Sequence, residues 1–240
     1  MREFYGDLHV HTCLSPCADL DMSPRSIMKE AKKKGLHFVG ICDHNSAENV
    51  RAAKKAGRRE NVGVIGGMEV TSSEEVHILA LFDGESHLRA LQRIMYDKLP
   101  GTNDARLYGD QIVVNEDDEV VRFNRKLLIG AADLTVHEVV DLIHRLNGLA
   151  VASHVDRQVF GIIGQLGFIP DDLHLDALEI RDRTRSGCLP CGQEFPVVFS
   201  SDAHFLKDVG KEHTAFLLME ATVEELRKSF RGQEGRRVIG

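Results

Sequence analysis

The chain has 240 residues, 42% hydrophobic and 28% charged, so it can bury a substantial core and falls in the size range of one-domain α/β barrels. Its net charge of −7 argues against broad electrostatic binding to nucleic acid or to an anionic membrane surface, because either usually requires a basic excess. The charge remains compatible with a nucleotide that is held through metal ions.

The N-terminal stretch MREFYGDLHVH has no apolar signal segment, and no run of about eighteen apolar residues occurs, which predicts a cytoplasmic protein without a membrane span. Cysteines stand at positions 13, 17, 42, 188 and 191. An odd number of cysteines without an export signal favours reduced thiols or metal ligands over structural disulfides.

Turn and capping signals divide the first hundred residues into alternating helices and strands. Ser23 followed by Pro24 is typical of a helix start, and Gly35 is typical of a helix end. The apolar run over 36–42 then predicts a strand. The same criteria predict a helix over 46–57, strands over 61–70 and 74–82, and a helix over 85–99.

The pattern changes between residues 101 and 130, where 111–124 has the alternation of two strands around an acidic turn. We interpret this segment as a β-hairpin inserted into one barrel domain that spans 1–240. Thr135 and Glu138 then form a capping-box pattern for a helix that ends at Gly148. Strands over 149–155, 176–180 and 196–202 follow, and a closing helix runs from Thr222 to about Gly232.

Seven parallel-type strands, near residues 3, 36, 62, 76, 149, 177 and 197, thus alternate mostly with helices. This order predicts an α/β fold, a distorted seven-stranded TIM-like (β/α)7 barrel with a small hairpin insertion. Functional residues of such barrels lie at the C-terminal ends of the strands.

Histidine and carboxylate side chains recur where these strands end. His9 and His11 can converge on one ion, because strand residues i and i+2 face the same side. The complete set is His9, His11, Asp43, His44, Glu69, His77, His154, Asp202 and His204. Each of them alone fits a hydrogen-bonded structural residue, but their recurrence at five strand ends predicts a pocket with two or three divalent ions.

The motifs DLHVHT, DHN, Glu69 with His77, SHVDR and SSDAH occur in an order that resembles the polymerase and histidinol phosphatase (PHP) family. The resemblance extends from Glu3 to about His204. It implies a distorted seven-stranded barrel, a binuclear or trinuclear centre of zinc, manganese or iron, and the hydrolysis of phosphoesters.

The resemblance also implies a ligand set for each ion. One ion would lie among His9, His11, Glu69 and Asp202, a second between His44 and His204, and a third among Glu69, His77 and His154. Many relatives have a further histidine or aspartate shortly after the H-x-H motif, where this chain has Cys17, so Cys17 is a candidate ligand of the second ion. Asp43, Asp202 and His204 are the candidate catalytic residues. Asp43 faces away from His44 and is expected to orient a ligand or to carry a proton.

Arginines and cysteines supply further candidates. Arg157, Arg183 and Arg185 follow predicted strands and are either phosphate-binding residues or solvated charges. Cys13, Cys17, Cys188 and Cys191 would form a four-thiolate zinc or iron–sulfur site if their two loops meet, although only one of the two pairs is a tight C-x-x-C.

We therefore expect a metal-dependent phosphoric ester hydrolase that uses a metal-activated water to hydrolyse a small phosphomonoester or a nucleotide. The first alternative is an exonuclease that trims short oligonucleotides, although the acidic balance disfavours extended nucleic acid as a partner. The second is a non-catalytic metal- or redox-responsive binding module. The sequence indicates no membrane partner, and it leaves the substrate and the oligomeric state open.

Overall fold

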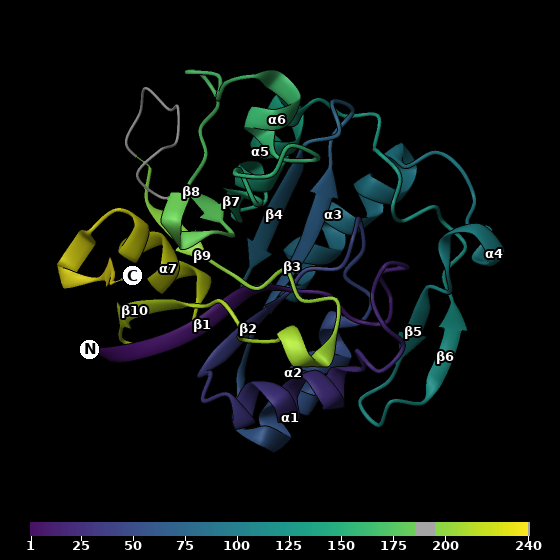
Figure 1. The fold of residues 1–240 in the computed structure, drawn as a ribbon, viewed down its shortest axis with the longest axis horizontal. Coiled ribbons are helices and arrows are strands. Elements are labelled where there is room, and N and C mark those ends of the chain that lie inside the picture. Colours follow the sequence, from purple (N-terminus) through teal and green to yellow (C-terminus); the bar gives the residue numbers. More distant parts are fainter. Residues whose placement is uncertain (186–194, 240) are drawn as a thin grey trace.

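The computed structural model describes residues 1–185 and 195–239, and Figure 1 labels its elements. The helices are α1 (Pro24–Lys33), α2 (Val50–Glu60), α3 (Glu85–Lys98), α4 (Ala105–Tyr108), α5 (Val136–Arg145), α6 (Ile162–Leu166) and α7 (Val223–Phe230). The strands are β1 (Arg2–Val10), β2 (Phe38–Ile41), β3 (Gly63–Thr71), β4 (His77–Phe82), β5 (Ile112–Val114), β6 (Val120–Phe123), β7 (Leu149–Ala152), β8 (Ala177–Ile180), β9 (Val197–Phe199), β10 (Thr214–Leu218) and β11 (Arg237–Val238). Short 3₁₀ turns cover 183–185, 206–208 and 233–235.

Nine of these strands form one curved sheet, in the order β11-β10-β1-β2-β3-β4-β7-β8-β9. β1, β2 and β3 run parallel to one another, and so do β7, β8 and β9. β10 and β11 extend the sheet beside β1 in antiparallel register. The predicted barrel-like α/β class is confirmed, with nine strands in the sheet instead of seven.

One of the seven predicted strands runs in the opposite direction. β4 pairs antiparallel with both β3 and β7, so its assignment as a parallel-type strand was wrong. The connection from β3 to β4 covers only 72–76 and closes a tight turn in which Ser72 N donates to Val76 O at 2.9 Å. A parallel pair needs a crossover of a dozen or more residues, so this connection permits only a hairpin.

The segment that follows β9 closes the barrel against β1. Ala203 forms a parallel bridge with Val10, and His11 N donates to Ala203 O at 3.0 Å. The buried carboxylate of Asp7 on β1 accepts hydrogen bonds from Ser201 N at 3.0 Å and from Gly210 N at 2.9 Å. Two segments about 190 residues apart in sequence are thereby held together at the barrel seam.

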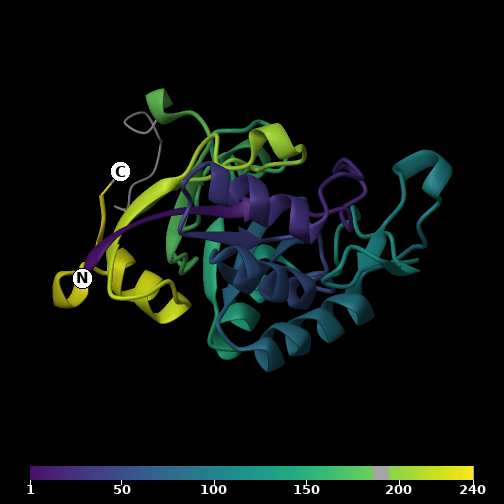
Figure 2. The ribbon, with the colours of Figure 1, turned by 90° about the horizontal axis from the view of Figure 1, so that it is seen from below.

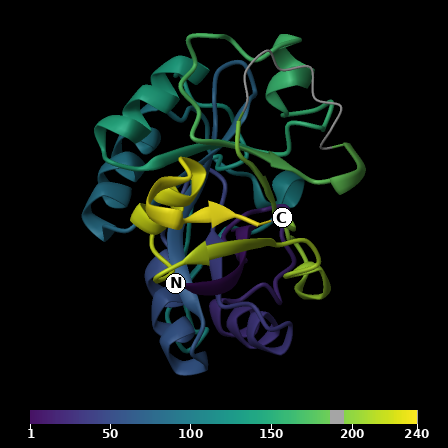
Figure 3. The same cartoon turned by 90° about the vertical axis from the view of Figure 1, so that its left-hand side faces the viewer.

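Apolar side chains form separate clusters on the two faces of the curved sheet. The larger cluster contains Met28, Ala53, Met95 and Ile143, which pack helices α1, α2, α3 and α5 against the outside of the sheet. The smaller cluster includes Leu8, Ile65 and Leu79 from β1, β3 and β4. Figures 1 and 3 show the helices around the sheet, with α7 near the two chain ends. The helices therefore shield the outer face and leave the strand ends available for a site.

The predicted capping signals are present in the structure. Ser23 Oγ accepts a hydrogen bond from Ser26 N at the start of α1, and Thr135 and Glu138 form the complete capping box of α5. The predicted hairpin is β5 paired with β6, and Figure 2 shows it projecting from the barrel together with α4. Among the helices of the described residues, none combines the length and hydrophobicity that crossing a membrane requires.

Candidate metal centre

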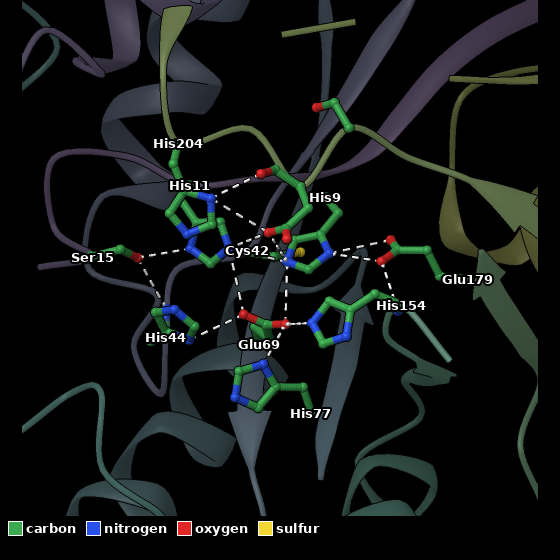
Figure 4. A network of polar contacts seen from close by, with 12 residues as sticks. His9, His11, Ser15, Cys42, His44, Glu69, His77, His154, Glu179 and His204 are labelled. Atoms are coloured by element: carbon green, nitrogen blue, oxygen red, sulfur yellow. Dashed lines mark hydrogen bonds and ion pairs between the residues drawn. The ribbon is translucent and has the colours of Figure 1, made fainter. Parts of the chain in front are cut away.

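Ligand-type side chains from several strands meet at one mouth of the barrel (Figure 4). His9 lies within β1, Glu69 lies near the end of β3, and His77 is the first residue of β4. The remaining ligand candidates lie in the segments that follow β1, β2, β7 and β9: His11, His44, His154, Asp202 and His204. All of them are buried except His204, which is partly exposed.

The innermost group consists of His9, His11, Glu69 and Asp202. The Nε2 atoms of the two histidines lie 3.0 Å apart. Glu69 Oε1 is 3.4 Å from His9 Nε2, and Glu69 Oε2 is 3.4 Å from His11 Nε2. Asp202 Oδ1 lies 3.6 Å and 3.3 Å from the same two nitrogens. Four electron-pair donors thus face one point, an arrangement that is stable only with a proton or a cation among them.

A divalent ion fits this group. A tetrahedral zinc ion with ligand distances of about 2.0–2.1 Å holds its ligand atoms roughly 3.3 Å apart. The separations in this group, from 3.0 Å to 3.6 Å, bracket that value. Two imidazoles and two carboxylates are donors that zinc, manganese and ferrous iron all accept.

The pKa values of His9 and His11 also fit a site that holds a single cation. Burial disfavours the charged form of His9, but Glu179, Glu69 and Asp202 outweigh it and raise its pKa well above the usual range. Burial, together with His204 and His44, lowers the pKa of His11 well below the usual range. The surroundings therefore stabilise one positive charge at His9 and disfavour a second positive charge on the adjacent imidazole of His11.

Two buried acids fix the ring orientations of these histidines. Glu179, on β8, accepts a hydrogen bond from His9 Nδ1 at 3.0 Å, which leaves His9 Nε2 free to face the pocket. His11 Nδ1 lies 2.9 Å from Ser15 Oγ, and that hydroxyl donates to Asp43 at 2.8 Å. Asp43 thus reaches His11 through Ser15 and does not itself face the pocket. Burial raises the pKa of Asp43, against the opposing effect of its bonds to Thr12 and Ser15.

Glu179 was missed in the sequence because it was considered only as part of a strand. Its signal is a lone acidic residue within the apolar run ALEI, all four residues of which are buried. A buried carboxylate is stable only with strong donors, and Glu179 has two of them, His9 Nδ1 and the backbone N–H of His154 at 3.1 Å.

Glu69 connects the innermost group to three other histidines. Its Oε2 lies 3.0 Å from His44 Nδ1, and its Oε1 lies 2.9 Å from His77 Nδ1 and 3.2 Å from His154 Nε2. Burial favours the neutral acid, but His77, His9 and His44 outweigh it and hold the pKa of Glu69 well below its usual range. One ionised carboxylate therefore borders all three predicted ligand groups, as a bridging ligand would.

Strained backbone conformations hold several of these residues in place. Asp202 has φ 50°, His154 has φ 28° and Asn45, next to His44, has φ 47°. Positive φ is uncommon for residues other than glycine and typically occurs at functional sites. Here it turns the chain sharply where β7 and β9 end, so that the side chains point into the mouth.

Two connected cavities lie over these ligands. The inner one, of about 160 Å³, is lined by Glu69, His77 and His154 and is bordered by the apolar side chains of Ile129 and Phe160. The outer cleft, of about 740 Å³, is lined by charged residues of both signs: Arg157, Arg181, Arg183 and Lys211, and Asp156, Asp182, Asp202, Asp208 and Glu212. Cys17, Arg157, Asp202 and His204 line both. A substrate entering through the outer cleft would therefore pass charged side chains of both signs, with Arg157 at the junction of the two cavities, before it reached the ligands.

The structure places the side chains of two of the three arginines named from the sequence, Arg157 and Arg183. Arg157 Nη1 donates to Asp202 Oδ2 at 3.0 Å, directly beside the ligand group. Arg183 binds Glu212 at 2.9 Å and lies over the ring of Phe199, so its charge is already balanced within the cleft wall. The side chain of Arg185 is outside the described part of the structure, so its role stays a prediction. Arg181, which was not predicted, does line the outer cleft.

The two N-terminal cysteines have different surroundings. The thiol of Cys13 is buried and directed at the carbonyl of Ile112 at 3.8 Å, whereas Cys17 lines both cavities. Burial opposes ionisation of Cys17, but His44 and His204 outweigh it and lower the pKa of its thiol to about 6. Cys188 and Cys191 lie outside the described residues, so the four-thiolate site stays a prediction.

A barrel with a mouth lined by histidines and carboxylates belongs to the class of metal-binding α/β barrels. The chain belongs to the PHP domain family, because the family model of the PHP domain matches residues 7–165 and that of the PHP-associated region matches 193–234. The family resemblance inferred from the motifs is thus confirmed. Members of this family are metal-dependent hydrolases.

The chain is similar to curated proteins over part of its length. It is 31% identical over 80 residues to phosphoribosyl 1,2-cyclic phosphate 1,2-diphosphodiesterase of Eggerthella lenta, covering 31% of this chain and 29% of that protein. It is 25% identical over 109 residues to a 5'-3' exoribonuclease of Haemophilus influenzae, covering 44% and 39%. The chain spans about half or less of the length of the curated relatives that it matches.

Among solved structures, the lesion-specific endonuclease Q of Pyrococcus furiosus has the same fold. The TM-score is 0.71 at 21% sequence identity, and the match covers 99% of this chain and 58% of that chain. A likeness at this identity concerns the fold, and the chemistry has to be argued from the site.

Proposed function

We propose that the chain is a metal-dependent phosphoesterase that hydrolyses a small phosphomonoester or a nucleotide. The observation that carries the proposal is the set of overlapping ligand groups, buried except for the partly exposed His204: His9, His11 and Asp202; His11, His44 and His204; and His44, Glu69 and His77. These groups share members, so they suit two or three divalent ions of zinc, manganese or iron lying close together. When bound, such ions supply a water of lowered pKa and neutralise charge on the phosphoryl oxygens.

Within this proposal, the chain's own residues have distinct roles. Glu179 and Ser15 hold the tautomers of His9 and His11, and Asp43 acts as a positioning residue through Ser15. Asp202 presents Oδ1 to the two histidines and Oδ2 to Arg157. The ligand groups thereby stay fixed while a substrate enters and leaves.

The rim residues bind the substrate in this proposal. His204 donates from Nδ1 to the carbonyl of Asp202 at 2.8 Å, so that its Nε2 is available to an ion or a leaving group. Arg157 lies beside Asp202 at the junction of the two cavities and is the proposed phosphate contact, with Arg181 and Arg183 further out. Arg183 would have to give up its bond to Glu212 to take part.

A second candidate, an exonuclease that trims short oligonucleotides, is favoured by the outer cleft. Phe205, next to His204, is 46% exposed and lines the cleft on which the three arginines lie. An exposed aromatic ring beside basic side chains is a typical surface for stacking a base next to its phosphate. The names of the exoribonuclease and endonuclease relatives are consistent with this candidate.

One set of measurements separates these functions. Metal per chain is measured by mass spectrometry on protein purified without chelator and without affinity tag, and the same protein is assayed on a phosphomonoester, a diester, nucleotides and oligonucleotides of increasing length. We expect two or three equivalents of metal and faster turnover of the monoester or nucleotide. Preference for oligonucleotides would favour the exonuclease, and less than one equivalent after anaerobic reconstitution would favour the binding module.

Variants test the role of the ligands. Asp202→Asn and His9→Ala are expected to abolish hydrolysis while the far-ultraviolet circular dichroism spectrum is kept. His87→Ala, on the exposed side of α3, and Asp110→Asn, outside the barrel, are the matched controls and should keep full activity. Turnover retained by Asp202→Asn would contradict the proposal.

A further inference from the structure

Two apolar side chains, Ile129 and Phe160, border the inner cavity. Every other described residue that lines this cavity carries an imidazole, a carboxylate, a guanidinium or a thiol. Neither Ile129 nor Phe160 is among the residues of the outer cleft, which meets the inner cavity at Cys17, Arg157, Asp202 and His204. The inner cavity therefore opens into the outer cleft on one side and has an apolar boundary elsewhere.

The segment that follows β6 holds Ile129 in a fixed position. The side-chain amide of the buried Asn45 donates from Nδ2 to Leu128 O at 2.9 Å and to Gly130 O at 2.8 Å. Its Oδ1 accepts from Thr71 N, on β3, at 3.1 Å. The carbonyls on both sides of Ile129 are thus joined to the residue that follows the ligand candidate His44. Ile129 is 36% exposed, so it is a rigidly held apolar side chain at the mouth and not part of the core.

The loop between β7 and α6 holds Phe160 just as firmly. Its ring stacks on the ring of His77, with centroids 4.5 Å apart and an interplanar angle of 10°. Its carbonyl oxygen accepts from His77 N at 3.0 Å. Phe160 has φ 64°, which for a bulky residue is an outlier of the kind that occurs at functional sites. The loop thus bears backbone strain to keep this ring over a ligand candidate.

The size of the inner cavity limits what can enter it. Its volume of about 160 Å³ corresponds to roughly five water molecules at about 30 Å³ each. A phosphoryl group with its free oxygens takes up most of that space, so an organic substituent on the phosphorus has to extend into the outer cleft. A monoester has one such substituent, whereas an open-chain diester has two that point in different directions.

We infer that Ile129 and Phe160 are specificity-determining residues that close the inner cavity against a second ester substituent. The site then accepts terminal phosphoryl groups and rejects open-chain diesters, including the internal linkages of oligonucleotides. The inference rests on the proposed function and narrows its substrate class to monoesters. Each side chain acts by its volume, since a pocket can reject an extra group for which it has no space.

Turnover of a matched pair of esters tests this role. The metal-loaded protein is assayed on p-nitrophenyl phosphate and on bis(p-nitrophenyl) phosphate, and the ratio of kcat/KM for the diester to that for the monoester is compared between variants. One methylene in an apolar pocket changes discrimination about tenfold or more, so Ile129→Ala and Phe160→Gly should each raise the ratio by roughly tenfold or more. Glycine is chosen at 160 because it adopts positive φ without strain. Ile129→Leu keeps the volume and should keep the wild-type ratio within about threefold.

Ligand binding supplies a readout that does not depend on turnover. Phenylphosphonate and diphenylphosphinate have one and two rings on phosphorus through bonds that are not hydrolysed, and calorimetry measures their affinities. We expect Ile129→Ala to raise the affinity for diphenylphosphinate relative to phenylphosphonate by roughly tenfold or more. Val159→Ala and Val121→Ala are the matched controls, because these valines are 54% and 61% exposed and line neither cavity. Both should behave as the wild-type protein.

The two possible failures are distinguishable. If the wild-type protein hydrolyses neither ester, the proposed function is wrong and this inference fails with it. If it hydrolyses the monoester but accepts the diester equally well, the phosphoesterase stands and the roles of Ile129 and Phe160 are wrong. The same holds if Ile129→Ala leaves both ratios within twofold of the wild-type values, or if Ile129→Leu raises them as much. Because Phe160 also stacks on His77, Ile129→Ala decides the matter if Phe160→Gly loses its metal.

Discussion

Replacing Glu179 with glutamine removes one negative charge from the centre without removing its hydrogen bonds. Oε1 of Glu179 accepts from both His9 Nδ1 at 3.0 Å and His154 N at 3.1 Å, so a glutamine with its carbonyl oxygen there satisfies both donors. The bond to His9 changes from a charge-assisted bond to a neutral one, and His9 becomes a weaker electron-pair donor. The effect should therefore appear in metal affinity and hardly at all in folding.

The magnitude follows from the role of such partners. Loss of an outer hydrogen-bond partner of a metal ligand lowers metal affinity by about 10–100-fold, or about 1.4–2.7 kcal/mol. Because glutamine keeps the hydrogen bond, Glu179→Gln should be at the low end, roughly tenfold. Glu179→Ala leaves two buried N–H groups without an acceptor, at about 1–3 kcal/mol each, and should both bind metal roughly a hundredfold more weakly and unfold more easily.

Zinc affinity is measured by competition with a chromophoric chelator, and stability by thermal unfolding of the metal-free protein. Glu220→Gln is the matched control, because Glu220 is exposed in the connection between β10 and α7, at the opposite end of the barrel. A zinc affinity of Glu179→Gln within twofold of the wild-type value would refute the role of Glu179. The reasoning would also be wrong if Glu179→Ala weakened binding no more than Glu179→Gln.

Three further predictions concern the seam, a helix and the thiols. Asp7→Ala deprives Ser201 N, Ser201 Oγ and Gly210 N of their hydrogen-bond acceptor, so it should lower the free energy of unfolding by about 3–5 kcal/mol. Urea titration measures this change. The control, Asp110→Ala, should change the free energy of unfolding by less than about 0.5 kcal/mol. Thr135→Ala removes the capping box of α5 and should cost about 1 kcal/mol; an unchanged unfolding midpoint would contradict this role of the cap. In metal-free protein, the alkylation rate of Cys17 should rise with pH around a midpoint of about 6, because the thiolate is the reactive form. Cys13, whose pKa burial raises to about 12, should stay unmodified at neutral pH. A midpoint for Cys17 at the ordinary value near 8.5 would exclude stabilisation of its thiolate by His44 and His204.

Local signals predicted most of the elements, because capping residues and periodicity act within a few positions. The pair Thr135 and Glu138 predicts a helix start, and the alternation over 111–124 predicts a hairpin. Both are present in the structure. β10 was missed because its five residues carry no turn signal of their own and pair with β1, more than 200 positions away. Long-range pairing of this kind leaves no mark in a short window of sequence.

The site shows the same division. Each ligand candidate could be named because a strand end fixes where its side chain points, whereas Glu179 and the route from Asp43 through Ser15 depend on contacts between strands. The arginines were harder to place. Arg157 and Arg183 do border the cleft, but so does Arg181, which was not predicted, because a loop sets no fixed direction for its side chains.

The reversed direction of β4 is what brings His77 into the centre. His77 is the first residue of β4, and it lies 2.9 Å from Glu69 because the tight turn over 72–76 returns the chain at the mouth of the barrel. If β4 ran parallel to its neighbours, Phe82 would be at the mouth, and His77 would lie five residues away, about 17 Å along the strand. The antiparallel direction of β4 therefore matters for the site, because it places the first residue of the strand, the buried His77, at the mouth of the barrel.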